Sequence, residues 1–147
     1  MARLPGSVLF ACSQNSIRSP MAESLLKHYH GKRVFVDSAG LRSSPVDPFA
    51  VAVMAELGID LAKHRSKTFD DLLDSSFDLV ITLSPEAHHR AMEMTRTMAC
   101  DVEYWPTFDP SVADGSREAV LDAYRSVRDE ILAKIKTRFP LTASPSG

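Results

Sequence analysis

The chain has 147 residues, 44% of them hydrophobic, which suits one globular domain with a single sizeable core. Its formal net charge is −2 and both signs are interspersed, so no basic tract favours a nucleic-acid or membrane surface. The two cysteines are too few for a disulfide framework or a cysteine-rich zinc site. The apolar run near the start is only about five residues long, too short for a signal-peptide core or a membrane span. We therefore expect a cytoplasmic protein.

Apolar runs typical of strands alternate with segments of helical periodicity along the chain. The expected strands cover residues 7–11, 33–40, 77–83 and 101–105. The expected helices cover residues 19–30, 48–57, 85–98 and 120–135. Gly31 ends the first helix, and Asp47 provides an N-cap for the second, with Pro48 in its first turn.

This alternation predicts an α/β fold, namely a single doubly wound domain with a four-stranded parallel sheet flanked by helices on both faces. We expect the domain to cover residues 1–140 and the small, polar segment 141–147 to be a disordered tail. Ligands of such folds bind beyond the carboxyl ends of the strands. The residues expected at that edge are Cys12, Ser38 to Gly40, Ser84 and Thr107 to Asp109.

The stretch "FACSQNSIRSP" (10–20) runs from an expected strand into an expected helix. Backbone N–H groups of such a loop can converge on one point in front of the helix N-terminus, which makes an anion site. Cys12 beside this positive potential should ionise to a thiolate near neutral pH, and Arg18 supplies a planar fork for two oxygens of an oxyanion. Asn15 tolerates the left-handed conformation that a tight cradle needs. Ser19 could cap the helix or donate a hydrogen bond to the thiolate.

The segment "VLFACSQNSIRSPMAE" resembles the phosphate-binding loop of the low-molecular-weight protein tyrosine phosphatases, whose fold is shared by thioredoxin-type arsenate reductases. Asp109-Pro110 is similar to an Asp-Pro found late in that family, and "VDSAG" and "FDLVITL" are similar to other family segments. The resemblance runs from about residue 7 to about residue 136. The family pattern Cys-x-x-Asn-x-x-Arg-Ser is met here by Cys12, Asn15, Arg18 and Ser19.

The resemblance implies a two-step phosphoryl transfer that uses no metal and no cofactor. In it Cys12 attacks phosphorus and forms a phosphocysteine, Arg18 holds the phosphoryl oxygens, and Asp109 protonates the leaving group before activating water. These roles agree with the general chemistry of thiolate nucleophiles, oriented donors and positioned carboxylic acids. The implied substrate is a phosphotyrosine protein or a small aryl phosphate, and the product is inorganic phosphate. The implied phosphate-binding residues are Ser13, Gln14, Asn15, Ser16, Ile17 and Arg18, with Asn15 and Ser19 in supporting roles.

Asp47-Pro48 is a second match to the Asp-Pro dipeptide, but the helical pattern after it explains Asp47 as a cap. Asp109 lies instead in a loop of aromatic residues and turn formers, where a catalytic group is expected. Trp105 and Phe108 flank this acid, and they either wall the pocket or only pack the loop.

Three histidines have structural explanations. His88 and His89 are adjacent, so on a helix they point about 100° apart and do not chelate one metal together. We expect them on a solvated face and His64 in a structural role.

The chain departs from the family pattern at two places. Ile17 stands where many members carry a second cysteine in the loop, and Ser111-Val112 follows Asp109-Pro110 where the eukaryotic phosphatases have a tyrosine pair. "YWPTFDP" is closer to the equivalent stretch of the arsenate reductases, which pass oxidising equivalents along three cysteines. Cys100 is the only other thiol here, and a small buried residue is its default explanation.

Two further functions stay open beside the phosphatase. One is an oxyanion reductase that works with an external thiol, and the other is a module that binds phosphate or a phosphoprotein without turnover. The expected cleft walls are Ser13, residues 41–46 and residues 105–108, which offer little apolar grip on an aryl ring. We therefore expect weak activity on phosphotyrosine peptides relative to small aryl phosphates.

Overall fold

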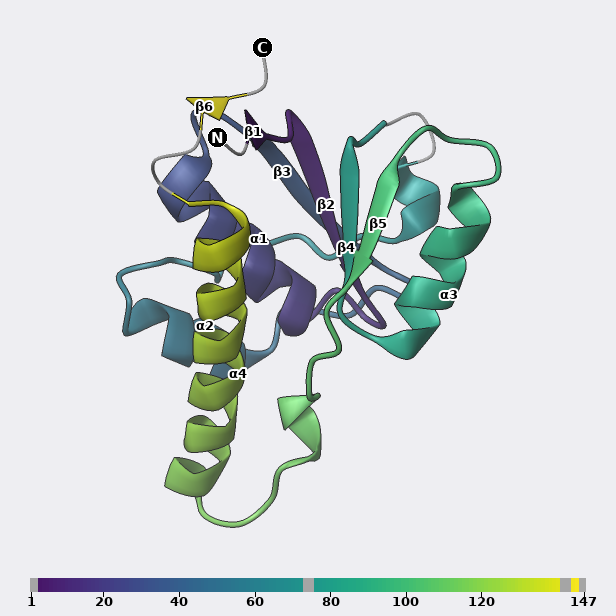
Figure 1. Ribbon diagram of the computed structural model, residues 1–147. Coiled ribbons are helices and arrows are strands. Elements are labelled where there is room, and N and C mark those ends of the chain that lie inside the picture. The colour runs from purple at the N-terminus through teal and green to yellow at the C-terminus, as the bar shows by residue number, and fades with distance from the viewer. Residues whose placement is uncertain (1–2, 73–75, 141–143, 146–147) are drawn as a thin grey trace.

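Strands and helices alternate in the computed structural model of the protein, which describes residues 3–72, 76–140 and 144–145 (Figure 1). Short 3₁₀ helices, labelled η, occur in two of the connections. The strands are β1 (Arg3–Leu4), β2 (Ser7–Cys12), β3 (Phe35–Gly40), β4 (Leu79–Thr82), β5 (Asp101–Tyr104) and β6 (Ser144–Pro145). The helices are α1 (Arg18–His30), α2 (Pro48–Ala55), η1 (Phe69–Leu72), α3 (Pro85–Met94), η2 (Pro110–Val112) and α4 (Arg117–Arg138).

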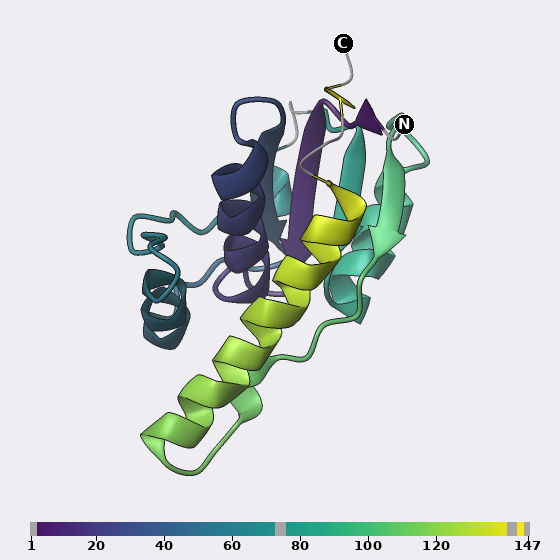
Figure 2. The same ribbon diagram turned by 60° about the vertical axis from the view of Figure 1, so that its left-hand side comes forward.

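The main sheet has four parallel strands in the order β3-β2-β4-β5. Helices α1, α2 and α4 lie on one face and α3 lies on the other (Figures 1 and 2). The predicted doubly wound α/β fold is confirmed. From β2 the chain passes to β3 on one side, whereas β4 lies on the other, so the chain reverses direction across the sheet at β2. Such a switch point leaves a crevice beyond the carboxyl end of the strand.

Alternate residues of β2 enter two different cores because successive side chains of a strand point to opposite faces. Val8 and Phe10 join the larger core under α1, α2 and α4, whereas Leu9 and Ala11 join the smaller core under α3. Every residue of β2 from Val8 onward is buried. The strand that leads into the cysteine loop is therefore held from both sides.

The helix boundaries follow the expected signals closely. Asp47 caps α2 by accepting from the backbone N–H groups of Phe49 and Ala50, and Gly31 follows the last residue of α1. Ser84 and Ser116 cap α3 and α4 in the same way, through their hydroxyl oxygens. Helix α1 is the exception, because Ile17 at its N-cap position offers no side-chain cap.

The two-residue strands β1 and β6 were not expected from the sequence. They pair in parallel, with Arg3 opposite Ser144 and Leu4 opposite Pro145. The other five residues of the expected disordered tail, 141–143 and 146–147, lie outside the described residues, so that expectation stays a prediction.

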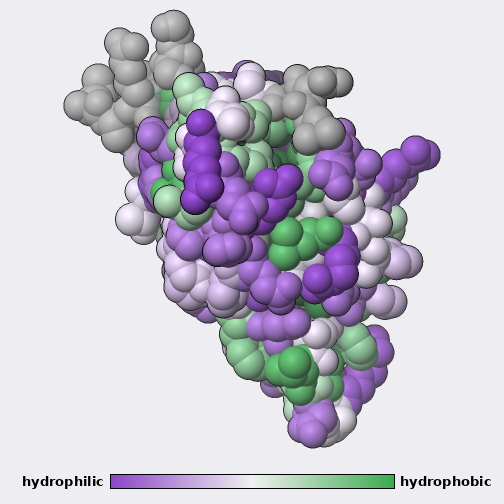
Figure 3. All heavy atoms as spheres, turned by 90° about the vertical axis from the view of Figure 1, so that its right-hand side faces the viewer, coloured by the Kyte–Doolittle hydropathy of each residue, from purple (hydrophilic) through white to green (hydrophobic). Residues whose placement is uncertain are grey.

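Polar side chains dominate the surface on the α3 side, and hydrophobic ones gather there only in small patches (Figure 3). Among the described residues, no helix is long and apolar enough to span a bilayer.

Candidate active site

The loop from Cys12 to Arg18 lies at the carboxyl edge of the sheet, at the switch point after β2. Residues after β3 hold it there, since the N–H of Leu41 donates to the Cys12 carbonyl at 3.3 Å and that of Arg42 to the Ser13 carbonyl at 2.9 Å. Gly40 allows this close approach, because a Cβ at that position would lie 2.6 Å from the backbone nitrogen of Asn15. The glycine of "VDSAG" is thus required by the cysteine loop.

Cys12 is 2% exposed, and its sulfur has two polar neighbours. The Ser19 Oγ lies 2.8 Å from Sγ, and the backbone N–H of Asn15 donates to Sγ at 3.3 Å. Of the two roles expected for Ser19, the structure has the contact with the thiol, because α1 begins at Arg18 without a side-chain cap. Hydrogen bonds from an N–H and a hydroxyl stabilise a thiolate, since both favour the charged form.

Asn15 has a φ of 51°, the left-handed conformation expected for it, and it is fully buried. Its Nδ2 donates at 2.9 Å to each of two hydroxyls, those of Ser19 and Ser38. Its Oδ1 accepts from the backbone N–H of Lys67 at 2.9 Å and lies 3.1 Å from Nε2 of His64. The amide is therefore satisfied at both ends, by α1, β3 and the segment before η1.

His64 and Glu23 form the next layer under the loop. The Ser38 hydroxyl donates to Oε1 of Glu23, and the same oxygen lies 3.9 Å from Nδ1 of His64. Burial lowers the pKa of His64, and the opposing effect of the Glu23 carboxylate is smaller. The expectation that His64 is structural agrees with these contacts, although nothing in the sequence signalled its meeting with Asn15.

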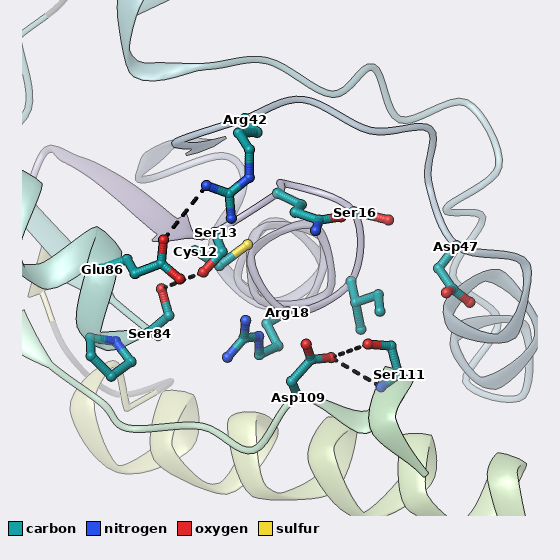
Figure 4. A pocket seen from close by; sticks show the side chains of 13 residues that line it. Cys12, Ser13, Ser16, Arg18, Arg42, Asp47, Ser84, Glu86, Asp109 and Ser111 are labelled. Carbon is teal, nitrogen blue, oxygen red and sulfur yellow. Dashed lines mark hydrogen bonds and ion pairs between the residues drawn. The ribbon is translucent and has the colours of Figure 1, made fainter. Parts of the chain in front are cut away.

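Arg18 connects the cysteine loop to the segment that carries the expected acid. Its side chain is 9% exposed, and Nη1 donates to the Thr107 carbonyl at 2.9 Å. Asp109 lies beside Arg18 at the cavity (Figure 4). Its Oδ1 accepts from the backbone N–H of Ser111 at 3.0 Å and from the hydroxyl of the same residue at 2.7 Å. The acid is thus held within its own turn, as the N-cap of η2.

A cavity of about 420 Å³ opens in front of the cysteine, a size typical of small-ligand sites. Every residue of the predicted cradle lines it except Asn15, whose side chain lies beneath the loop. In all, the cavity is lined by Cys12, Ser13, Gln14, Ser16, Ile17, Arg18, Arg42, Asp47, Ser84, Pro85, Glu86, Asp109 and Ser111. None of these side chains is aromatic.

Trp105 and Phe108 do not line this cavity, so the first of the two roles considered for them, that of a pocket wall, does not fit the structure. Trp105 packs against Phe10, with ring centroids 6.1 Å apart, and lines a separate hollow between β5 and α4. Phe108 is 57% exposed. The core beside β2 and β4 takes the indole because its large apolar surface is more stable there than at a polar cleft.

Asp47 both caps α2 and lines the cavity, so its cap role did not exclude it from the site. Its N–H donates to the Ser16 carbonyl at 3.1 Å, and its Oδ2 accepts from the Tyr124 hydroxyl at 3.0 Å. Burial of Tyr124, followed by its contact with Asp47, raises the pKa of that phenol. Asp47 therefore connects the cysteine loop to α4.

Sequence reasoning expected Ser84 at this edge of the sheet, but it missed Glu86 in the first turn of α3. Ser84 and Glu86 line the cavity, and the Ser13 hydroxyl donates to Oγ of Ser84 at 3.1 Å. Ser84-Pro85 marks a helix start directly after a strand, so the sequence could have placed Glu86 at the same edge, in the first turn of that helix.

The expected solvated face of α3 holds for His89 but not for its neighbour. The side chain of His89 is 83% exposed. His88 instead stacks on Tyr104, with ring centroids 4.6 Å apart, and its Nδ1 is 2.9 Å from the Thr82 hydroxyl. Among the described residues, no group of three His, Cys, Asp or Glu side chains could hold a metal ion.

Cys100 lies far from the cavity. It directly precedes β5 at the amino edge of the sheet, where Asp101 pairs with Leu79 and Leu79 pairs with Val8. Cys12 ends β2 at the carboxyl edge, so the two thiols are separated by about 16 Å along the strands alone. Burial, together with the charge of Asp101, raises the pKa of the Cys100 thiol. Cys100 is therefore not within disulfide distance of Cys12.

Comparison with known proteins agrees with this geometry. An arsenate reductase from Halalkalibacterium halodurans is 40% identical over 131 residues, covering 88% of this chain and 92% of that protein. A solved arsenate reductase in its oxidized state is 29% identical with a TM-score of 0.73, covering 90% of this chain and 95% of the other. A solved low molecular weight protein tyrosine phosphatase from T. tengcongensis is 25% identical with a TM-score of 0.71, covering 88% and 95%.

The family model described as low molecular weight phosphotyrosine protein phosphatase matches residues 7–141, which contain the cysteine loop, Asp109 and all four strands of the main sheet. The chain therefore belongs to the low molecular weight phosphotyrosine protein phosphatase family, a class of cysteine-based enzymes.

Proposed function

We propose that the protein is a cysteine-dependent phosphatase that hydrolyses phosphate monoesters without a metal, through a phosphocysteine. The observation that carries this proposal is the meeting of Cys12, Arg18 and Asp109 at one cavity in which Cys12 is the only thiol. Hydrolysis needs a nucleophile, an anion cradle and an acid, and it needs no electrons.

In the first step the Cys12 thiolate attacks phosphorus, the S–P bond forms and the bond from phosphorus to the leaving oxygen breaks. Arg18 and the loop N–H groups hold the three equatorial oxygens, whose charge these preorganised donors stabilise. The Asn15 N–H, which donates to Sγ, and the Ser19 hydroxyl, 2.8 Å from it, hold the sulfur in place for this step.

Asp109 provides the proton for the leaving oxygen in the first step. In the second step its carboxylate takes a proton from water, which attacks the phosphocysteine and releases inorganic phosphate and the thiolate. The fit of this residue rests on its place at the cavity beside Arg18 and on a turn that holds its Oδ1 and leaves Oδ2 available.

Arsenate reduction with an external thiol is the second candidate, and the names of the sequence relatives favour it. Reduction of arsenate to arsenite takes two electrons, which two thiols supply when they form a disulfide. Cys12 offers one thiol, and the distance to Cys100 excludes that residue as the second. A reductase of this kind would therefore need glutathione or a thioredoxin-like protein as its co-reactant.

The experiment is hydrolysis of p-nitrophenyl phosphate at about pH 6 with a chelator present, comparing the wild type with Cys12→Ser and Asp109→Ala. We expect turnover to survive chelation, to vanish without the thiol and to fall without the acid. A folded wild type without turnover would contradict the phosphatase. Arsenate consumption with glutathione or thioredoxin is then the assay for the second candidate.

A further inference from the structure

Arg42 and Glu86 form an ion pair at the cavity that the proposed chemistry does not use. The Arg42 Nη1 lies 3.6 Å from Oε2 of Glu86, and both residues line the cavity. The backbone of Arg42 is fixed beside the nucleophile, because its N–H donates to the Ser13 carbonyl. Arg42 and Asp109 lie on opposite sides of Cys12 at the cavity (Figure 4).

This ion pair is easily opened. The side chain of Arg42 is 58% exposed and that of Glu86 is 60% exposed, and ion pairs with such exposure contribute little to stability. An anionic oxygen bound closer to the guanidinium, in bidentate geometry, would replace Glu86 at small cost. The guanidinium of Arg42 is therefore available to a ligand.

Two further basic residues lie in the segment next to the loop of Arg42, outside the cavity lining. The backbone N–H of Ser44 donates to Ser66 Oγ at 3.0 Å, and the Ser66 hydroxyl donates to the Gln14 carbonyl at 3.2 Å. These bonds place residues 62–67, with the exposed Lys63 and Arg65, beside the loop of Arg42. The acids Asp47 and Asp109 lie on other walls of the cavity (Figure 4).

We propose that Arg42 is a specificity-determining residue, which binds a second anionic group of the substrate while the cysteine loop binds its phosphoryl group. The preferred substrate is thus a phosphate monoester that also carries a carboxylate or a second phosphate. Glu86 holds the guanidinium in the absence of such a ligand and competes with the anionic group for it. This inference rests on the proposed function, since it assigns the phosphoryl group to the loop around Cys12.

Binding of two non-hydrolysable phosphonates tests the inference without turnover. Phosphonoacetate carries a phosphonate and a carboxylate, and ethylphosphonate has the same two-carbon skeleton without the carboxylate oxygens. Calorimetric titration would compare them on the wild type, on Arg42→Gln and on Glu86→Gln. Arg96→Gln is the matched control, because Arg96 is an exposed arginine in the turn after α3, outside the cavity.

We expect the wild type and Arg96→Gln to bind phosphonoacetate about tenfold more tightly than ethylphosphonate, as one charge-assisted contact predicts. Arg42→Gln should reduce this preference to about twofold or less, and Glu86→Gln should increase it. Equal binding of the two phosphonates by the wild type, or a preference that Arg42→Gln leaves intact, would overturn the inference alone. Failure of both phosphonates to bind would overturn the proposed function together with it.

Discussion

The two halves of the candidate site are built in different ways. The nucleophile side rests on the Asn15 cluster, defined as Asn15, Ser19, Ser38, His64 and Lys67, whose contacts come from α1, β3 and the segment before η1. The acid side is the acid loop, residues 105–116, in which the described hydrogen bonds of the Asp109 carboxylate all come from Ser111 of its own turn. The nucleophile is therefore fixed by long-range buried contacts, and the carboxylate of the acid by local contacts near the surface.

Because of this difference, substitutions on the nucleophile side should lower the stability of the fold, whereas substitutions at the acid should affect mainly the chemical step. Removing a member of the Asn15 cluster leaves buried polar groups without partners, which costs stability as well as the position of the sulfur. A substitution at Asp109 that keeps the local turn should alter only proton transfer. The connection between the halves is the bond from Arg18 to the Thr107 carbonyl, together with Asp47, which joins the cysteine loop to α4.

The largest expected effect is on catalysis by Asp109→Asn. The asparagine keeps an oxygen that can accept from Ser111 but has no acidic proton to transfer to the leaving group, so kcat should fall by about 10²–10⁴-fold. The free energy of unfolding should stay within about 0.5 kcal/mol of the wild type. Steady-state hydrolysis of phenyl phosphate, which has a poor leaving group, and urea denaturation measure the two quantities. A clear fall in the free energy of unfolding together with the fall in kcat would show that Asp109 is not held by its local turn alone.

The next largest effect is the loss of stability that we expect for Asn15→Gly. Glycine accepts the φ of 51° without strain, so the loss is that of the four side-chain contacts and should be about 2–4 kcal/mol. Asn15→Ala is the matched variant and should lose about 1–2 kcal/mol more, because alanine is strained in the left-handed region. Urea denaturation of the three proteins measures both differences. An Asn15→Gly protein as stable as the wild type would contradict the claim that buried contacts of Asn15 stabilise the nucleophile side.

The third effect concerns the aryl group of the substrate. The cavity has no aromatic wall, and Phe108 of the acid loop is mostly exposed. Phosphotyrosine peptides should therefore show a kcat/KM about tenfold below that of small aryl phosphates, a size typical of a missing apolar contact. Parallel assays of p-nitrophenyl phosphate and a neutral phosphotyrosine peptide measure the ratio. A clear preference for the peptide would mean that the acid loop closes over the ring.

The smallest effect is the pH dependence contributed by His64. Because burial lowers its pKa below the ordinary 6.5, the unfolded chain binds the proton more tightly than the folded protein. This residue therefore reduces stability as the pH falls below 6.5, by at most about 1.4 kcal/mol per pH unit. The slope of unfolding free energy between pH 6.5 and 5 should be smaller in His64→Gln than in the wild type. Equal slopes would contradict a neutral, buried His64.

The main elements of the fold could be predicted from the sequence because each depends on a pattern of neighbouring residues. The apolar residues at 7–11 predict a buried strand, and the capping chemistry of Asp47-Pro48 predicts the start of a helix. The pairing of β1 with β6 could not be predicted, because a strand of two residues shows no periodicity and the two strands are far apart in the sequence.

The acid loop marks the limit of sequence reasoning at the site. The flanking positions of Trp105 and Phe108 left open whether these residues wall the pocket or pack the loop, and only the structure showed that the indole packs against Phe10. Asp47 and Asp109 were distinguished as cap and acid, yet both line the cavity. A dipeptide shows what a residue can do locally, and only the folded chain determines which surface it faces.

By itself the sequence determined the α/β fold, the loop that joins β2 to α1, and the left-handed Asn15 within it, because each depends on residues close together in the chain. Only the tertiary structure decided that Asn15 meets Ser38 and His64, that Arg42 meets Glu86 at the cavity, and that Cys100 lies at the opposite edge from Cys12. The physical reason is that such meetings depend on strand order and packing, and no local pattern encodes the partner of a side chain that lies many residues away.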